Sequence, residues 1–259
     1  MARTLTNEQN LARRQAEYAR EIRNMRISRY LEIALGVLFL AGGAAWKYAM
    51  GHPEASTWPL WVGGVLLFIA IGQAVHQRET AGEAADTEEV RVLKKSIADL
   101  LDEKLANDHY VLNDLRLQVG REKCWVDHLV VAPSGIFVIN TVHWGGEIFG
   151  DPSKKAYEWK IRNADGSVRP AHNPVGRALR ERRILCNWLK GTNLVWERVF
   201  PVVVFANPEA KLNVRSTRDR LMTPEQLVNF INDFCFEKPA LSNAEVEKLA
   251  NGLNEQQNR

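Results

Sequence analysis

An acidic residue, Asp127, interrupts the otherwise apolar segment Trp-Val-Asp-His-Leu-Val-Val that begins at Trp125. A carboxylate in such a segment is paired, binds a ligand, or lies near solvent at a strand end, because burying it alone is costly. A turn at Pro133 and Ser134 folds this strand against the next one. Asp127 then falls opposite, or nearly opposite, Asn140. The sequence therefore predicts a site built around Asp127 on a two-stranded hairpin.

This geometry is known from metal-dependent nucleases, in which one strand supplies an aspartate and its neighbour supplies a carboxylate, a spacer and a lysine. The carboxylates bind Mg²⁺, which activates water and stabilises the charge that develops on the phosphate. The lysine assists as a point charge. Asn140, Thr141 and Val142 occupy the second strand here.

Seven segments occur in an order that carries a family resemblance. They are Glu88-Glu89-Val90, Tyr110 to Asp114, Val126 to Val131, Pro133 to Ile139, Asn140 to Gly146, Asn173-Pro174 and Pro201 to Phe205. Together they resemble the NERD (nuclease-related) domain of the PD-(D/E)xK nuclease superfamily, over residues from about 86 to 215. The resemblance implies a mixed sheet flanked by helices and, in an active form, Mg²⁺-dependent hydrolysis of phosphodiesters.

The chain departs from the family pattern at two positions. By resemblance, Asn140 stands where a metal-binding glutamate is expected, and Val142 stands where the lysine is expected. Asp127 remains, and Glu89 (or its neighbour Glu88) is the candidate helix-borne ligand. Two explanations stay open: an inactive pseudonuclease that retains the fold for binding, or an active enzyme with relocated residues. The candidates for relocation are the carboxylate of Glu147 and the amines of Lys154, Lys155 and Lys160.

An arginine cluster follows Asn173-Pro174, the predicted start of a helix. Arg177, Arg180 and Arg183 are three residues apart and share one helix face. Such a face binds the phosphates of DNA or RNA. The alternative is a solvated helix face without a ligand, because residues 77–259 have no net charge.

The elements that position these residues alternate between helices and strands. Apolar periodicity and turn residues predict a helix from 86, strands at 110–118, 125–132, 135–141, 147–149 and 157–162, a helix at 173–190, a strand at 199–206, and helices from 223 and 242. Capping sequences precede the helices at Asp86, Thr223 and Ser242. This order predicts an α/β domain of PD-(D/E)xK type, a mixed sheet flanked by helices.

The N-terminal region has a different composition. The chain carries 34 Lys and Arg against 31 Asp and Glu, and the surplus lies in residues 1–30, with seven Arg and three Glu. Two nearly uncharged runs follow, at 30–50 and 58–75. Each approaches the roughly 20 apolar residues that cross a bilayer. Because the basic residues flank this pair of runs, we expect a transmembrane hairpin with both termini in the cytoplasm, in a bacterial inner membrane.

The predicted organisation is an Arg-rich arm at 1–28, a transmembrane hairpin at 29–76, a linker at 77–86, a NERD-like domain at 87–215 and C-terminal helices at 216–259. Three distant cysteines without a CxxC pair favour reduced thiols. The leading functional hypothesis is a membrane-anchored protein that binds or processes nucleic acid. The alternatives are a metal-dependent nuclease, which would need Mg²⁺, and a tethered module for a protein partner or for homo-oligomers.

Overall fold

A computed structural model describes most of the chain. The described residues are 2–5, 8–46, 57, 61–71, 88–151, 159–190, 198–214, 221–234 and 241–256. The chain divides into two compact units, one of residues 1–14 with 86–259 and one of residues 15–85. Residues 1–14, the first half of the predicted arm at 1–28, thus group with residues 86–259. The predicted linker at 77–86 lies outside the described residues.

Six strands form the larger sheet, in the order β1-β2-β3-β4-β8-β10. Their bounds are Arg3–Leu5, Tyr110–Val119, Glu122–Ala132, Gly135–Val142, Val199–Phe205 and Leu221–Met222. Strand β3 is antiparallel to both β2 and β4, whereas the other neighbours run parallel. The sheet is therefore mixed, as the sequence predicts, and β8 lies inside it with nearly every residue buried.

A smaller sheet has the order β7-β6-β5-β9. Its strands are Val168–Ala171, Trp159–Arg162, Gly146–Gly150 and Ala210–Val214. Because β4 ends at Val142 and β5 begins at Gly146, the chain leaves the main sheet just after the predicted catalytic positions. Strands β1, β7, β9 and β10 were not predicted from sequence, since they are short or carry little apolar alternation.

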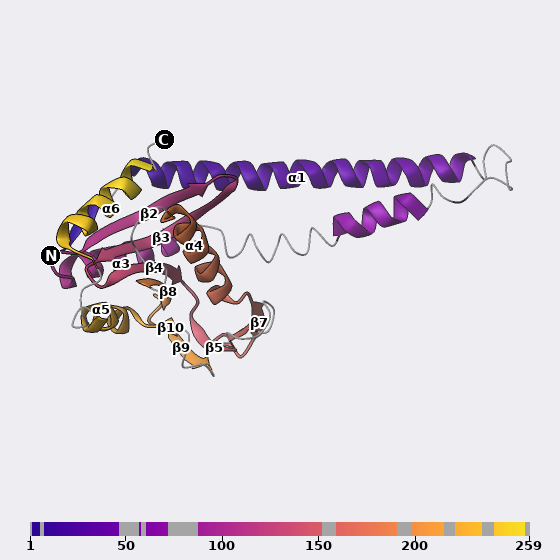
Figure 1. Cartoon of the computed structure of the whole chain (residues 1–259). Coiled ribbons are helices and arrows are strands. Elements are labelled where there is room, and N and C mark those ends of the chain that lie inside the picture. The colour runs from indigo at the N-terminus through magenta and orange to yellow at the C-terminus, as the bar shows by residue number, and fades with distance from the viewer. Residues whose placement is uncertain are drawn as a thin grey trace. The chain divides into compact units, whose positions relative to one another are not determined.

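Helices cover both faces of the larger sheet (Figure 1). On one face, α3 (Glu88–Lys104) and α5 (Pro224–Phe234) pack on a core that includes Ile97, Val130 and Val202. On the other, α4 (Pro174–Trp188) and α6 (Asn243–Gln256) pack on Leu129 and Val131. The domain is a mixed α/β fold in which each sheet face buries an apolar layer.

Side chains at Asn173, Thr223 and Ser242 cap helices as predicted, whereas the predicted cap at Asp86 lies outside the described residues. Asn173 accepts a hydrogen bond from the amide of Val175 at the start of α4. Thr223 and Gln226 exchange backbone and side-chain hydrogen bonds before α5, and Ser242 and Glu245 do so before α6. These contacts satisfy amide groups that the first helical turn leaves without partners.

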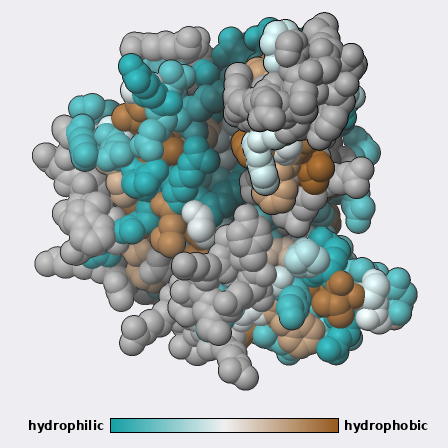
Figure 2. All heavy atoms as spheres, turned by 90° about the vertical axis from the view of Figure 1, so that its right-hand side faces the viewer, coloured by the Kyte–Doolittle hydropathy of each residue, from teal (hydrophilic) through white to brown (hydrophobic). Residues whose placement is uncertain are grey.

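The N-terminal region contains a long helix, α1, from Glu8 to Ala44. By length and composition, its segment Arg26–Ala44 is the only described helix long and apolar enough to cross a membrane. The second predicted span appears as a shorter apolar helix, Trp61–Ile71, whose neighbours 58–60 and 72–75 are outside the described residues. Figure 2 shows the face of the molecule that lies on the right-hand side of Figure 1. Hydrophilic residues cover much of the described surface of this face, and apolar residues form small separate groups.

Candidate functional site

The hairpin of β3 and β4 has the register that the turn at Pro133 and Ser134 predicts. Ala132 pairs with Gly135, and the pairs continue to His128 opposite Ile139. The next pair in this register brings Asp127 opposite Asn140. The backbone amide of Thr141 donates a hydrogen bond to Oδ2 of Asp127 at 3.0 Å. The sequence prediction of this hairpin is confirmed.

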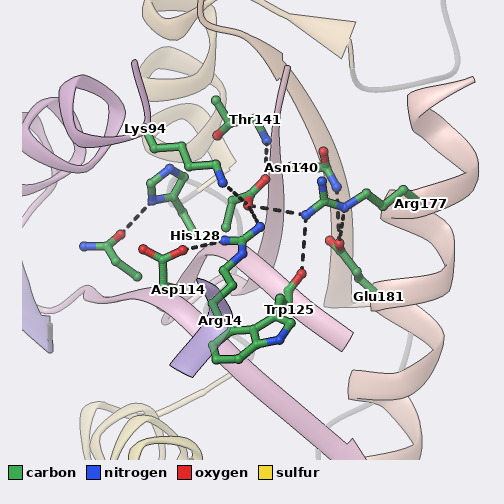
Figure 3. Close-up of polar contacts among 11 residues, drawn as sticks. Arg14, Lys94, Asp114, Trp125, His128, Asn140, Thr141, Arg177 and Glu181 are labelled. Atoms are coloured by element: carbon green, nitrogen blue, oxygen red, sulfur yellow. Dashed lines mark hydrogen bonds and ion pairs between the residues drawn. The ribbon is translucent and has the colours of Figure 1, made fainter. Parts of the chain in front are cut away.

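Three cationic side chains converge on the other carboxylate oxygen of Asp127. Oδ1 lies 2.7 Å from Nη2 of Arg14, 3.3 Å from Nζ of Lys94 and 3.3 Å from Nη2 of Arg177. Figure 3 shows these three side chains reaching one point from different elements. Burial alone would raise the pKa of Asp127, but the charges of Arg177, Lys94 and Arg14 and the Thr141 amide hold it well below its usual range.

A second buried carboxylate, Glu181, lies beside Asn140. Its Oε1 accepts hydrogen bonds from Nε of Arg177 at 2.8 Å and from Nδ2 of Asn140 at 3.2 Å. Burial raises the pKa of Glu181 to about 7, although the charge of Arg177 opposes this shift. The guanidinium group of Arg177 therefore bridges two carboxylates, those of Asp127 and Glu181.

A third carboxylate, Asp114, approaches the centre because strand β2 is distorted there. Asp114 has a φ of +50°, which is uncommon for a residue with a side chain. Leu112 and Leu115 both lie in the same core cluster, although residues three apart in a regular strand point to opposite faces. On β3, Val126 and Leu129 are also three residues apart and lie in this cluster, so the alternation of side chains between the two sheet faces shifts by one residue there as well. The distortion turns Asp114 toward Arg14, whose Nη1 binds it.

His128 lies next to a cavity of about 410 Å³ between α3 and the sheet, which Lys94, Asp102, Asn113 and Asp114 also line. Its Nδ1 donates to Oδ1 of Asn113 at 2.7 Å. Nε2 is buried without a hydrogen-bond partner among the described residues. Burial lowers the pKa of His128 to about 4, so the imidazole is neutral near pH 7.

The other predicted ligands lie elsewhere. Glu89 is exposed in the first turn of α3. Glu147, on β5 of the smaller sheet, pairs with Arg162 at 3.1 Å. Within the described residues, no three His, Cys, Asp or Glu side chains are grouped so that they could hold a metal ion. The structure therefore does not bring together Asp127, Glu89 and Glu147, the metal ligands predicted from the sequence.

The expected lysine position is occupied by apolar packing. Val142 belongs to a buried cluster with Trp144 and Phe205. Of the candidate replacements, Lys160 is exposed on β6, and residues 152–158, with Lys154 and Lys155, lie outside the described residues.

Sequence reasoning did not identify Lys94. A signal was available, since Lys94 lies on the same helical face as Val90, Ile97 and Leu101 and is buried with them. For Arg14, in a polar N-terminal segment, the sequence holds no comparable signal.

The arginine face of α4, defined as Arg177, Arg180 and Arg183, lies along the first half of β3. Arg177 donates to the carbonyl of Trp125 at 3.5 Å and Arg180 to that of Lys123 at 3.4 Å. Arg183 pairs with Glu122 at 2.8 Å, and both of these side chains are largely exposed. The three arginines are thus one row, as predicted, and they also join the helix to the strand.

Comparisons with known proteins give one match. Residues 87–206 match the family model described as "Nuclease-related domain" (NERD). Searches of curated proteins and of solved structures found no match. The matched segment contains Lys94, Asp127 and Glu181 but not Arg14. Residues 87–206 of this chain are therefore a nuclease-related domain, joined in the same compact unit by residues 1–14 and by the C-terminal helices.

Proposed function

We propose that this protein is a membrane-anchored, nuclease-related protein that binds nucleic acid at the cytoplasmic face of a bacterial inner membrane without hydrolysing it. The observation that carries the proposal is the position of Arg177. Its guanidinium group contacts Asp127 and Glu181, so a cationic side chain lies between the carboxylates of a nuclease-related centre. A centre filled by cations favours binding of an anionic chain over metal-dependent cleavage.

The residues present do not fit Mg²⁺. This ion prefers several oxygen ligands around it, but Oδ1 of Asp127 is already shared by three cations. Asn140 directs its amide nitrogen at Glu181, and Val142 is packed in the core. No hydrolytic step is therefore assigned to this centre.

The arginine face offers the surface for phosphates. The side chains of Arg177 and Arg183 are 42% and 62% exposed, and Arg180 is exposed as well. Arg180 contacts the backbone carbonyl of Lys123, whose side chain is exposed and carries a further positive charge. Guanidinium groups match phosphate oxygens in geometry and keep their charge at all physiological pH values. A row of such groups on one helix would bind a phosphate backbone with little preference for sequence.

Two features of residues 15–85 support membrane anchoring. Large apolar side chains are exposed on both helices, among them Leu38 and Phe68. The helices also approach closely, because a Cβ added at Gly63 would lie 2.8 Å from the carbonyl oxygen of Gly36. Small residues at such a crossing are typical of helices packed in lipid. A reporter enzyme that is active only outside the cytoplasm should be active when fused after residue 54 and inactive when fused at the C-terminus. The reverse pattern would refute this topology.

Nucleic-acid binding is tested with the full chain in detergent micelles. Fluorescence anisotropy of labelled DNA and RNA oligonucleotides, single- and double-stranded, is measured over a series of salt concentrations. We expect binding that weakens with salt, and a loss of about tenfold with a smaller salt slope for Arg180→Ala/Arg183→Ala. Arg20→Ala/Arg23→Ala is the matched control, because it removes two exposed arginines with the same spacing from α1. Absence of binding at low salt would leave the protein-interaction module as the better hypothesis.

One observation favours the alternative of an active nuclease. Lys94 and Glu181 lie beside Asp127 and Asn140, where relocated catalytic groups would be expected. The full chain is therefore assayed for cleavage of supercoiled and single-stranded DNA with Mg²⁺ or Mn²⁺. Cleavage that Asp127→Asn abolishes would replace the present proposal, whereas cleavage that survives this substitution indicates a contaminant. We expect no cleavage by either protein.

A further inference from the structure

Arg14 is almost completely buried, with 1% of its surface exposed. One of its terminal nitrogens binds the carboxylate of Asp114, and the other binds that of Asp127 at 2.7 Å. Its Cζ lies 5.9 Å from the ring centroid of Trp125. A guanidinium group suits this site because it is planar and presents two donors side by side while its face meets an aromatic ring.

Residues 2–5 form hydrogen bonds with the same domain. Strand β1 adds to the edge of β2, with Arg3 opposite Tyr110. The backbone amide of Ala2 donates to the carbonyl of Asp102, and the hydroxyl of Thr4 donates to its carboxylate at 2.6 Å. These contacts hold residues 2–5 on the domain, so that α1 begins beside it and Arg14 reaches the centre.

The two arginines at Asp127 share one oxygen atom. Oδ1 is 2.7 Å from Arg14 and 3.3 Å from Arg177. Arg14 is buried, whereas Arg177 is partly exposed and belongs to the arginine face. While Arg14 neutralises Asp127, the carboxylate holds Arg177 less strongly, because each cation reduces the attraction left for the next. Without Arg14, Asp127 would hold Arg177 more strongly against the strand.

We infer that Asp114, Trp125 and Asp127 form a guanidinium-binding socket whose ligand is Arg14 of the chain's own N-terminal helix, and that its occupancy sets how available Arg177 is to an external anion. The socket is a binding site of the chain in its own right. Its effect on Arg177 rests on the proposed nucleic-acid binding. Because Arg14 lies outside the segment that matches the nuclease-related family, the socket adds to the domain a contact from the region that leads into the candidate membrane span.

The socket is tested first by chemical rescue, without nucleic acid. The melting temperature of the full chain in detergent should fall by about 10 °C in Arg14→Ala. Guanidinium chloride at non-denaturing millimolar concentrations should restore about 2 °C to this variant relative to the same concentration of NaCl. Wild type and Arg14→Ala/Asp127→Asn should show no such gain. Arg13→Ala, which removes an exposed neighbouring charge, should melt like wild type.

Equal responses of all variants to guanidinium would overturn the socket. If Arg14→Ala does not fold, the melting temperature of Arg14→Lys tests the socket instead, because lysine keeps the charge but loses the paired donors. A wild-type melting temperature for Arg14→Lys would show that any cation suffices and would refute a guanidinium site.

The effect on Arg177 is read from oligonucleotide affinity. Arg14→Ala should bind single-stranded DNA about fivefold more weakly than Arg13→Ala, which has the same net charge. If wild type binds and the two variants bind equally, the coupling fails while the proposed function stands. If wild type does not bind, the proposed function fails and the rescue experiment still tests the socket.

Discussion

The guanidinium group of Arg14 lies 2.7 Å from the carboxylate of Asp127, although 113 positions separate the two residues. Both side chains are almost inaccessible to solvent. This pair joins the N-terminal helix to the hairpin of the nuclease-related domain. It replaces the environment expected for a metal-binding aspartate with one in which side-chain cations neutralise the carboxylate.

Loss of Asp127 should destabilise the protein strongly. Asp127→Ala removes the carboxylate that Arg14 and Lys94 share in the interior, and breaking a buried ion pair by removing one partner costs about 3–5 kcal/mol. The free energy of unfolding is measured by urea titration of the full chain. Glu122→Ala is the control, because it removes a carboxylate paired with an α4 arginine at the exposed surface, where a pair contributes about 0–1 kcal/mol. Equal losses for both variants would contradict a tightly bound centre.

Two buried groups should give opposite pH dependences of stability. The pKa of Glu181 is raised to about 7 from 4.5, so the folded state binds more protons than the unfolded state in this range. Its contribution therefore lowers stability as the pH rises from 4.5 to 7. The pKa of His128 is lowered to about 4 from 6.5, so the unfolded state binds more protons and stability rises between pH 4 and 6.5. In the wild type these two contributions oppose each other.

Single substitutions should separate these effects. Glu181→Gln leaves the contribution of His128, so stability should rise with pH from about 4.5 to 6.5. His128→Asn keeps a donor for Asn113 and leaves the contribution of Glu181, so stability should fall over the same range. Urea titrations at several pH values measure both slopes, and the double variant, which lacks both contributions, serves as the reference. Slopes of the same sign in the two variants would contradict these pKa directions.

Restoring the expected motif should not create a nuclease. Asn140→Glu places a second carboxylate next to Glu181, which Asn140 now contacts at 3.2 Å. Val142→Lys inserts an amine into the cluster around Trp144. We expect the double variant to lose about 3 kcal/mol or more of stability and to show no Mg²⁺-dependent cleavage.

Val142→Met is the control for this experiment, because it enlarges the side chain without adding a charge and should cost about 1–3 kcal/mol, less than a buried amine. A stable double variant that cleaves DNA would show that the centre keeps the architecture of an active enzyme.

Gly135 should be essential for the hairpin that places Asp127. It has a φ of +143°, and an added Cβ would lie 2.4 Å from the carbonyl oxygen of Arg198. Gly135→Ala should therefore destabilise the protein by more than about 2 kcal/mol. Gly120→Ala is the control at the neighbouring turn, since Gly120 has a φ of +59° but open space around it. It should cost only about 1 kcal/mol. Similar losses of stability for the two variants in thermal unfolding would show that the positive φ alone, and not the close contact with Arg198, sets the cost of the substitution.

The sequence by itself determined the local structure of the domain. Alternating apolar residues and the Pro133-Ser134 turn specify the hairpin, and capping residues such as Thr223 and Ser242 specify where helices begin. These signals lie within a few residues of one another, so they can be read along the chain. The expected motif also showed that Asn140 and Val142 depart from the family pattern.

Only the tertiary structure decided what surrounds Asp127. Arg14, Lys94 and Glu181 come from three helices, and their contacts depend on how those helices pack on the sheet. The change of side-chain phase at Asp114 is likewise set by the packing of two strands. An ion pair carries no period or spacing in the sequence, because its energy depends on distance in space and on burial. The nuclease-related fold can thus be predicted from the sequence, whereas the grouping of two arginines and a lysine around Asp127 is a property of the folded domain.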